Sequence, residues 1–115
     1  MYEYQARVVR VIDADTFEFE VDLGFKLKLL ETFRLGGVDA WETRGVERED
    51  GLRAKDRVIE LFAASKNEVI VRTAKGDGKG KYGRWIADVY VDVDGEYQSL
   101  GEILVEEDHA EPYRV

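Results

Sequence analysis

The sequence predicts a mainly β fold with helices (α+β), and three observations lead to it. Five short segments are rich in β-branched and aromatic residues or alternate apolar with polar residues, as strands do. One helical pattern lies between the third and fourth of these segments, and a second follows the fifth. The chain has 115 residues, 44% of them hydrophobic, and no cysteine. This suits a single domain over residues 1–115 with a core that needs no disulfides.

The predicted order of elements is β-β-β-α-β-β-α. Five short strands with a helix inserted after the third fit a five-stranded OB-fold barrel. Closing the sheet removes its edges, and the mouth of such a barrel is a common place for oligonucleotides. A β-sandwich is the alternative, but it does not naturally place a helix between the third and fourth strands.

The first three predicted strands follow one another with short breaks, as in a meander. Residues 5–12 are β-branched and apolar, and residues 13–15 interrupt them. Residues 16–23 alternate cleanly, and residues 26–35 alternate again before two glycines. The apolar face of the second strand carries Phe17, Phe19, Val21 and Leu23, and that of the third begins with Leu27 and Leu29.

A polar loop without a period and then a helix are predicted in the middle of the chain. The loop covers residues 39–50, and the helix covers residues 50–64 with Asp50 as its N-cap. The predicted apolar side of this helix consists of Leu52, Val58, Ile59, Leu61 and Phe62.

Two more strands are predicted over residues 68–73 and 85–93. Between them, residues 74–83 form a loop that contains four glycines and several basic residues. Asp94 and Gly95 are a strong turn pair after the last strand. Ser99 then caps a short helix over residues 100–107.

The net charge of −8 at first argues against nucleic acid as a partner, because lysine and arginine bind phosphates. The acidity is concentrated late in the chain, since residues 92–115 hold eight acidic residues and one basic residue, a net of −7. Residues 1–91 therefore carry only −1, and residues 75–84 within them carry +3. A nearly neutral body with a basic loop leaves nucleic acid open as a partner.

Three polar clusters lie at predicted strand ends or in adjoining loops, where a rigid scaffold can hold a site. They cover residues 13–16, 33–43 and 81–84. The carboxylates of Asp15 and Asp39, with backbone carbonyls and water, offer only oxygen ligands. Such a set suits Ca²⁺ or Mg²⁺ and not zinc.

Two arginines and a third carboxylate complete the candidate chemistry. Arg34 and Arg84 carry planar guanidinium groups that match phosphate oxygens. If these groups hold a phosphodiester, Glu42 is the candidate to take a proton from an attacking water. Taken singly, each cluster also fits ordinary turn residues, a surface arginine or a solvated basic loop. Their joint occurrence favours a site.

The clusters together resemble the staphylococcal nuclease (thermonuclease) family over nearly the whole chain. The matching segments are residues 11–16, 33–35 and 38–43, residues 45–47 before the helix, and residues 81–84 before the last strand. The resemblance implies a five-stranded OB barrel with helices. It also implies Ca²⁺-dependent hydrolysis of DNA and RNA that leaves 3′-phosphate ends.

By this resemblance, Asp15 and Asp39 fall on the calcium-binding aspartates, and Mg²⁺ or Mn²⁺ are possible substitutes for the ion. Asp13 falls on a nearby aspartate that shapes the surroundings of the metal. Ala40 falls where the family commonly has threonine, which gives a backbone carbonyl to the metal. Alanine retains that carbonyl. Trp41 replaces a common proline, so the loop loses a restraint on φ.

The resemblance also assigns the substrate-facing residues. Arg34 and Arg84 fall on the two phosphate-binding arginines, and Glu42 falls on the catalytic glutamate. Further contacts with the substrate are expected from Lys81, Tyr82 and Tyr113.

The expected substrate is single-stranded DNA or RNA, and the alternative is a nuclease-like barrel that binds nucleic acid or protein without cleaving it. No stretch approaches the ~18 apolar residues of a membrane span, and the first residues lack the layout of a signal peptide. We therefore expect an intracellular or cytoplasmic protein without a membrane partner, with secretion after removal of a leader as the alternative. A monomer is expected. His109, the one histidine, is expected at the surface.

Overall fold

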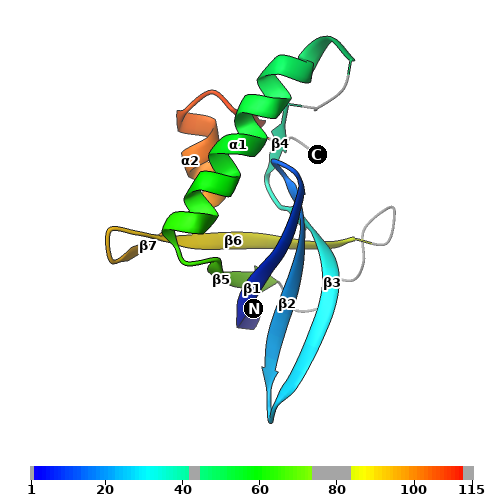
Figure 1. Cartoon of the computed structure of the whole chain (residues 1–115), viewed down its shortest axis with the longest axis vertical. Helices are drawn as coiled ribbons and strands as arrows, with labels where there is room; N and C mark the ends of the chain where they lie inside the picture. The colour runs from blue at the N-terminus through cyan, green and yellow to red at the C-terminus, as the bar shows by residue number, and fades with distance from the viewer. Residues whose placement is uncertain (1, 42–44, 74–83, 113–115) are drawn as a thin grey trace.

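The computed structural model of the chain describes residues 2–41, 45–73 and 84–112 and has the predicted α+β fold. A six-stranded sheet has the order β3-β2-β1-β5-β6-β7. Its strands are β1 (Tyr2–Asp13), β2 (Thr16–Gly24), β3 (Leu27–Leu35), β5 (Glu68–Thr73), β6 (Trp85–Val93) and β7 (Glu96–Ser99). Because β3 also pairs with β6, five of these strands form a closed ring, as expected for an OB-like fold (Figure 1).

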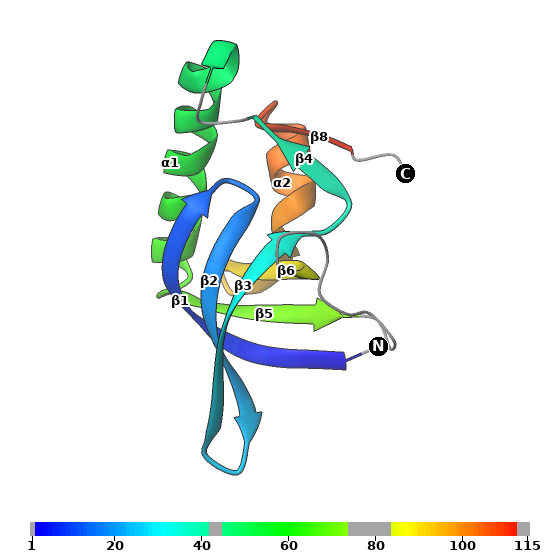
Figure 2. The ribbon, with the colours of Figure 1, turned by 90° about the vertical axis from the view of Figure 1, so that its right-hand side faces the viewer.

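Two short strands and the helices surround this ring. Strands β4 (Val38–Ala40) and β8 (Ala110–Pro112) pair antiparallel in a second, two-stranded sheet. A 3₁₀ turn, η1 (Gly45–Glu47), leads into the long helix α1 (Arg48–Ala64). Figure 2 shows the shorter helix α2 (Leu100–Glu106) close to the β4–β8 pair.

Four phenylalanine rings form the centre of the core. Phe17 and Phe19 of β2 lie 5.4 Å apart between ring centroids, and Phe62 of α1 lies 5.2 Å from Phe17 with its edge toward it. Phe33 of β3 adds a contact at 5.4 Å to Phe19. Since both phenylalanines of β2 are fully buried, the alternation predicted for this strand is confirmed at its inner end.

The ring closes through a short parallel pairing, in which Phe33–Leu35 lie beside Trp85–Ala87. Two backbone hydrogen bonds reinforce the junction: Leu35 N–H donates to the Asp15 carbonyl at 2.8 Å, and Gly36 N–H donates to the Ala87 carbonyl at 2.9 Å. The start of β2, the end of β3 and the start of β6 therefore meet at one end of the ring.

Several predicted elements are confirmed. The first three strands form an antiparallel meander, and the strands at residues 68–73 and 85–93 have the predicted bounds. Asp94 and Gly95 have positive φ angles of 55° and 88° at the predicted turn. Ser99 caps α2 by accepting a hydrogen bond from the Glu102 N–H at 3.3 Å. The predicted loop at residues 74–83 lies outside the described residues.

The prediction of a helix over residues 50–64 differs from the structure in two details. It begins at Arg48, so Asp50 lies in its first turn, where it pairs with Arg53, and is not the N-cap. Leu52 and Ile59 are 40% and 45% exposed. The buried face follows the helical spacing of Ala54, Val58, Leu61 and Phe62 instead, because this stripe is the one that meets the ring.

The structure contains three short strands that the sequence did not predict. Residues 39–50 are not entirely loop, since β4 occupies the start of this stretch, and β7 and β8 are also additional. Strands of three or four residues are too short to show a period in the sequence. Neither of the described helices is long and apolar enough to cross a membrane.

The outer part of the β2–β3 hairpin also differs from the prediction. Leu23, Leu27 and Leu29 alternate as expected, but all three are exposed because this end of the hairpin extends beyond the ring (Figure 2). Phe25 at its turn is 97% exposed and has a φ of 55°. The apolar face of the hairpin therefore belongs to the core only at its inner end.

Candidate metal and phosphate site

The predicted site residues that the structure describes gather at the end of the ring where β3 meets β6. Asp15 lies in the turn between β1 and β2, and Arg34 lies near the end of β3. Asp39 is the middle residue of β4, and Arg84 directly precedes β6. Four separate segments of the chain thus supply the charged side chains.

Asp15 is held by groups on both sides of its carboxylate. Oδ1 accepts a hydrogen bond from the Thr16 hydroxyl at 3.0 Å, and Oδ2 accepts one from the Ala40 backbone N–H at 3.2 Å. The Asp15 side chain is 13% exposed. Its carboxylate is therefore fixed in place and is only slightly exposed.

Arg34 lies between the two predicted metal-binding aspartates. Its Nη2 is 3.1 Å from Asp39 Oδ1 and 3.5 Å from Asp15 Oδ2, and its side chain is 20% exposed. Its Nη1 donates to the carbonyls of Leu35 and Val38, at 2.7 and 3.0 Å. The guanidinium thereby neutralises part of the charge of the two carboxylates and is itself held rigidly.

The turn between β3 and β4 contains two glycines, and its backbone requires the second, Gly37. Gly37 has a φ of 77°, which strains other residues. A Cβ on Gly36 would lie 3.4 Å from side-chain atoms of Asp88 and Ile86, at the edge of ordinary van der Waals contact. This turn folds β4 back so that Arg34 reaches the Val38 carbonyl.

Arg84 joins the same network through Thr16. Its Nη1 lies 3.5 Å from the Thr16 hydroxyl, which in turn donates to Asp15. Asp13, at the end of β1, pairs with Thr16 in the β1–β2 ladder and is half-buried. Both arginines and the two aspartates are therefore connected within a few ångströms.

The oxygen atoms in this network suit a hard cation such as Ca²⁺. Asp15 and Asp39 supply carboxylates, and the Ala40 N–H points away from β8 toward Asp15. The carbonyl of a strand residue leaves the same edge as its N–H, so the Ala40 carbonyl lies on this edge too. Among the described residues, no three acidic, histidine or cysteine side chains converge. A cation here would rely on two carboxylates, the carbonyl and water.

Four of the predicted site residues cannot be compared with the structure. Glu42, Lys81, Tyr82 and Tyr113 lie outside the described residues. Their proposed roles stay predictions that rest on the sequence.

Two contacts of the C-terminal segment with this site were missed by the sequence reasoning. Glu111 of β8 lies directly opposite Asp39, and both side chains are on the exposed face of the β4–β8 pair. The indole Nε1–H of Trp41 donates to the Asp108 carbonyl at 2.8 Å. The only sequence signal is the apolar–polar–apolar pattern of residues 38–40, which does not identify β8 as the partner strand.

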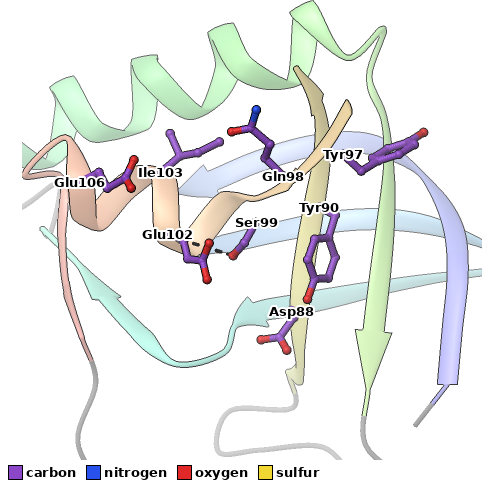
Figure 3. A pocket seen from close by; sticks show the side chains of 8 residues that line it. All are labelled: Asp88, Tyr90, Tyr97, Gln98, Ser99, Glu102, Ile103 and Glu106. Atoms are coloured by element: carbon purple, nitrogen blue, oxygen red, sulfur yellow. Dashed lines mark hydrogen bonds between the residues drawn. The ribbon is translucent and has the colours of Figure 1, made fainter. Parts of the chain in front are cut away.

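A separate hollow of about 480 Å³ lies on the face formed by β6, β7 and α2 (Figure 3). Its lining includes three carboxylates, those of Asp88, Glu102 and Glu106, together with Tyr90 and Tyr97. No basic residue lines it among those described. Like charges disfavour phosphate here, so this hollow is a poor candidate for nucleic acid.

A family model described as "Staphylococcal nuclease homologue" matches residues 32–115, which is more than half of the chain. The chain belongs to this family. No curated protein sequence matches it. The family match covers Arg34, Asp39, Ala40 and Arg84, but it begins after Asp15. The contacts of Asp15 with Ala40 and Arg34 join this aspartate to the matched part of the staphylococcal nuclease domain.

Proposed function

We propose that this protein is a nuclease that hydrolyses phosphodiester bonds of single-stranded DNA and RNA in a Ca²⁺-dependent reaction, leaving 3′-phosphate ends. One observation carries the proposal: Asp15, Arg34, Asp39 and Arg84 come from separate segments and form one connected network. Two carboxylates beside two guanidinium groups combine the ligands of a hard cation with the partners of a phosphate.

Asp15, Asp39 and the Ala40 carbonyl are the groups that would hold Ca²⁺, with Mg²⁺ or Mn²⁺ as possible substitutes. When bound, the ion supplies positive charge next to the scissile phosphate. The carboxylates lower the net charge of the chain, yet as ligands they assist binding of an anionic substrate. This explains how an acidic protein can act on a polyanion.

Arg34 and Arg84 would bind the non-bridging oxygens of the phosphate and stabilise the charge that develops in the transition state. Glu42 would accept a proton from the attacking water, whose oxygen then bonds to phosphorus. The bond from phosphorus to the 5′ oxygen breaks, and the phosphate stays on the 3′ oxygen. The departing 5′ oxygen takes up a proton.

The test is digestion of denatured DNA and of RNA with Ca²⁺ and with a chelator in its place. Cleavage that needs Ca²⁺ and yields 3′-phosphate ends supports the proposal. Absence of cleavage at high enzyme concentration, over several pH values, would refute it. Glu42→Gln should lower kcat far more than it weakens substrate binding, whereas equal losses contradict the role of Glu42 as a base. Glu60→Gln is the matched control, because the Glu60 side chain is on the exposed face of α1.

A binding module without catalysis is the second candidate, and one observation favours it. Both terminal nitrogens of Arg34 are already engaged by two carbonyls and two carboxylates of the protein. A phosphate must therefore compete with these groups. Binding of a labelled oligonucleotide that is never cleaved, with or without Ca²⁺, would establish this alternative.

A further inference from the structure

The strand that carries Asp39 and Ala40 has few contacts within a sheet. β4 has three residues, and among the described elements its ladder partner is β8, which also has three. A two-stranded ladder of this length is marginal by itself. Contacts outside the ladder must help to fix the Asp39 carboxylate and the Ala40 peptide.

Trp41, directly after β4, makes two hydrogen bonds to one turn. Its backbone N–H donates to the His109 carbonyl at 3.3 Å, and its indole Nε1–H donates to the Asp108 carbonyl at 2.8 Å. The indole N–H can only donate, so its position depends on where this acceptor lies. The end of β4 is thereby tied to the turn between α2 and β8.

The turn itself is firmly held. Asp108 has a φ of 60°, and the N–H groups of residues 107–109 all donate to carbonyls of α2, at 2.8 to 3.2 Å. Arg57 of α1 donates twice to the Glu107 carboxylate, at 2.7 and 3.0 Å. The acceptor of the indole hydrogen bond is therefore a fixed point that is connected to both helices.

We propose that Trp41 is a positioning residue of the site. Its indole N–H, held by the Asp108 carbonyl, fixes the end of β4. The Ala40 peptide then stays beside the Asp15 carboxylate, to which its N–H donates, and the Asp39 carboxylate stays beside Arg34. The effect on catalysis rests on the proposed nuclease function, whereas the effect on the position of β4 does not.

By the resemblance described in the sequence analysis, Trp41 stands where the family commonly has proline, and its two hydrogen bonds take the place of that restraint. Proline restrains the backbone covalently but has no N–H. Trp41 restrains it through two hydrogen bonds that proline cannot make. The restraint is non-covalent, so removing a single donor can weaken it.

Trp41→Phe tests the proposal, because it keeps a ring and the backbone N–H and removes the indole donor. We expect faster hydrogen exchange of the Ala40 amide, measured by NMR. We expect the Kd for Ca²⁺, measured by calorimetry, to rise about fivefold, the scale of one hydrogen bond. In cleavage assays kcat should fall more than KM rises, since misplaced groups slow the chemical step.

Ser65→Ala is the matched control. Ser65 donates to the Glu68 carbonyl at 2.7 Å and accepts from the Asp92 N–H at 2.9 Å. Asp92 is near the C-terminal end of β6, whereas the candidate site is at the start of this strand. This variant should lose at least as much stability as Trp41→Phe. Its Ca²⁺ affinity and the exchange rate of its Ala40 amide should match those of the wild type.

The two hypotheses fail in different ways. If Trp41→Phe is destabilised but keeps wild-type Ala40 exchange and Ca²⁺ affinity, Trp41 is only structural and the inference is overturned. If the wild type neither cleaves nor binds Ca²⁺, the proposed function fails. In that case the hydrogen-exchange rate of the Ala40 amide still tests the positioning role of Trp41. A faster rate in Trp41→Phe than in Ser65→Ala supports this role, and equal rates overturn it.

Discussion

The two ends of the β2–β3 hairpin have the same alternating sequence pattern but different surroundings. At the inner end, Phe17, Phe19 and Phe33 are buried, and Arg34 follows directly in the candidate site. At the outer end, Leu27 and Phe25 are 60% and 97% exposed. The difference arises because β6 and α1 cover only the inner end. Alternation therefore tells which side chains share a face, but not whether another element covers that face.

The largest expected effect is at the buried inner end. Phe19→Ala should lower the free energy of unfolding by about 3–5 kcal/mol, because it leaves a cavity among three aromatic rings. Urea unfolding measures the loss. Leu27→Ala, on the same hairpin but exposed, is the control and should change stability little. Similar losses in both variants would contradict the contrast between the two ends.

Arg34 tests whether the inner end is also where the chemistry occurs. Arg34→Lys keeps the charge but cannot form the paired contacts of a guanidinium. Cleavage should fall roughly 100-fold, the scale of one lost electrostatic contact in a transition state. Steady-state kinetics measures this loss, and Arg53→Lys, at an exposed side chain of α1, serves as control. If both variants retain wild-type rates, Arg34 has no role in the reaction.

The ion pair between Arg57 and Glu107 lies away from the hairpin and tests how much an exposed contact contributes to stability. Hydrogen bonds from Arg57 hold the pKa of Glu107 below its ordinary value. The contribution of the pair is therefore complete above the ordinary pKa of a glutamate and is lost as the pH falls through the lowered pKa. Glu107→Gln should cost about 0.5 kcal/mol at neutral pH, as exposed pairs do.

At a pH below the lowered pKa of Glu107, Glu107→Gln should be as stable as the wild type. Thermal unfolding at a series of pH values measures the difference between the two proteins. A difference that stays constant into strong acid would show that the charge of Glu107 is not its cause.

The smallest effect is expected at the outer turn. Phe25 has a φ of 55°, a conformation that asparagine adopts more easily than phenylalanine. Since its ring is exposed, Phe25→Asn should change the free energy of unfolding by no more than about 0.5 kcal/mol, in the stabilising direction. Urea unfolding again gives the measurement. A clear loss of stability would indicate that the ring of Phe25 packs on the protein after all.

The sequence predicts the fold in its long elements and misses its short ones. Strands such as β5 and β6 have enough residues to show a pattern, and Ser99 is recognisable as a cap. The pairing of β4 with β8 depends on residues about 70 positions apart, and a local pattern cannot reveal it. Likewise, Leu52 and Ile59 belong to the apolar side predicted for α1 but are exposed, because the sequence pattern does not show which stripe of the helix meets the ring.

The sequence predicts residues for a candidate site but not how they connect in the folded chain. Asp15, Arg34 and Arg84 stand at or beside strand ends, as the sequence predicts, whereas Asp39 lies in the middle of the short strand β4. That Arg34 lies between both aspartates follows from the turn at Gly37, which only the folded chain defines. The link from Trp41 to Asp108 has no local signal, because its two residues are 67 positions apart in the sequence.

The parallel pairing of β3 with β6 has a consequence for how the protein folds. The antiparallel meander of β1 to β3 joins neighbouring segments and has a low cost in loop entropy, whereas Phe33 meets Trp85 only after the intervening residues are closed into a loop. Non-local contacts of this kind slow folding. Arg34 lies within this junction and Arg84 directly precedes β6, so a ligand that binds both arginines recognises only chains that have completed this non-local contact. Such a ligand would slow unfolding more than it speeds folding.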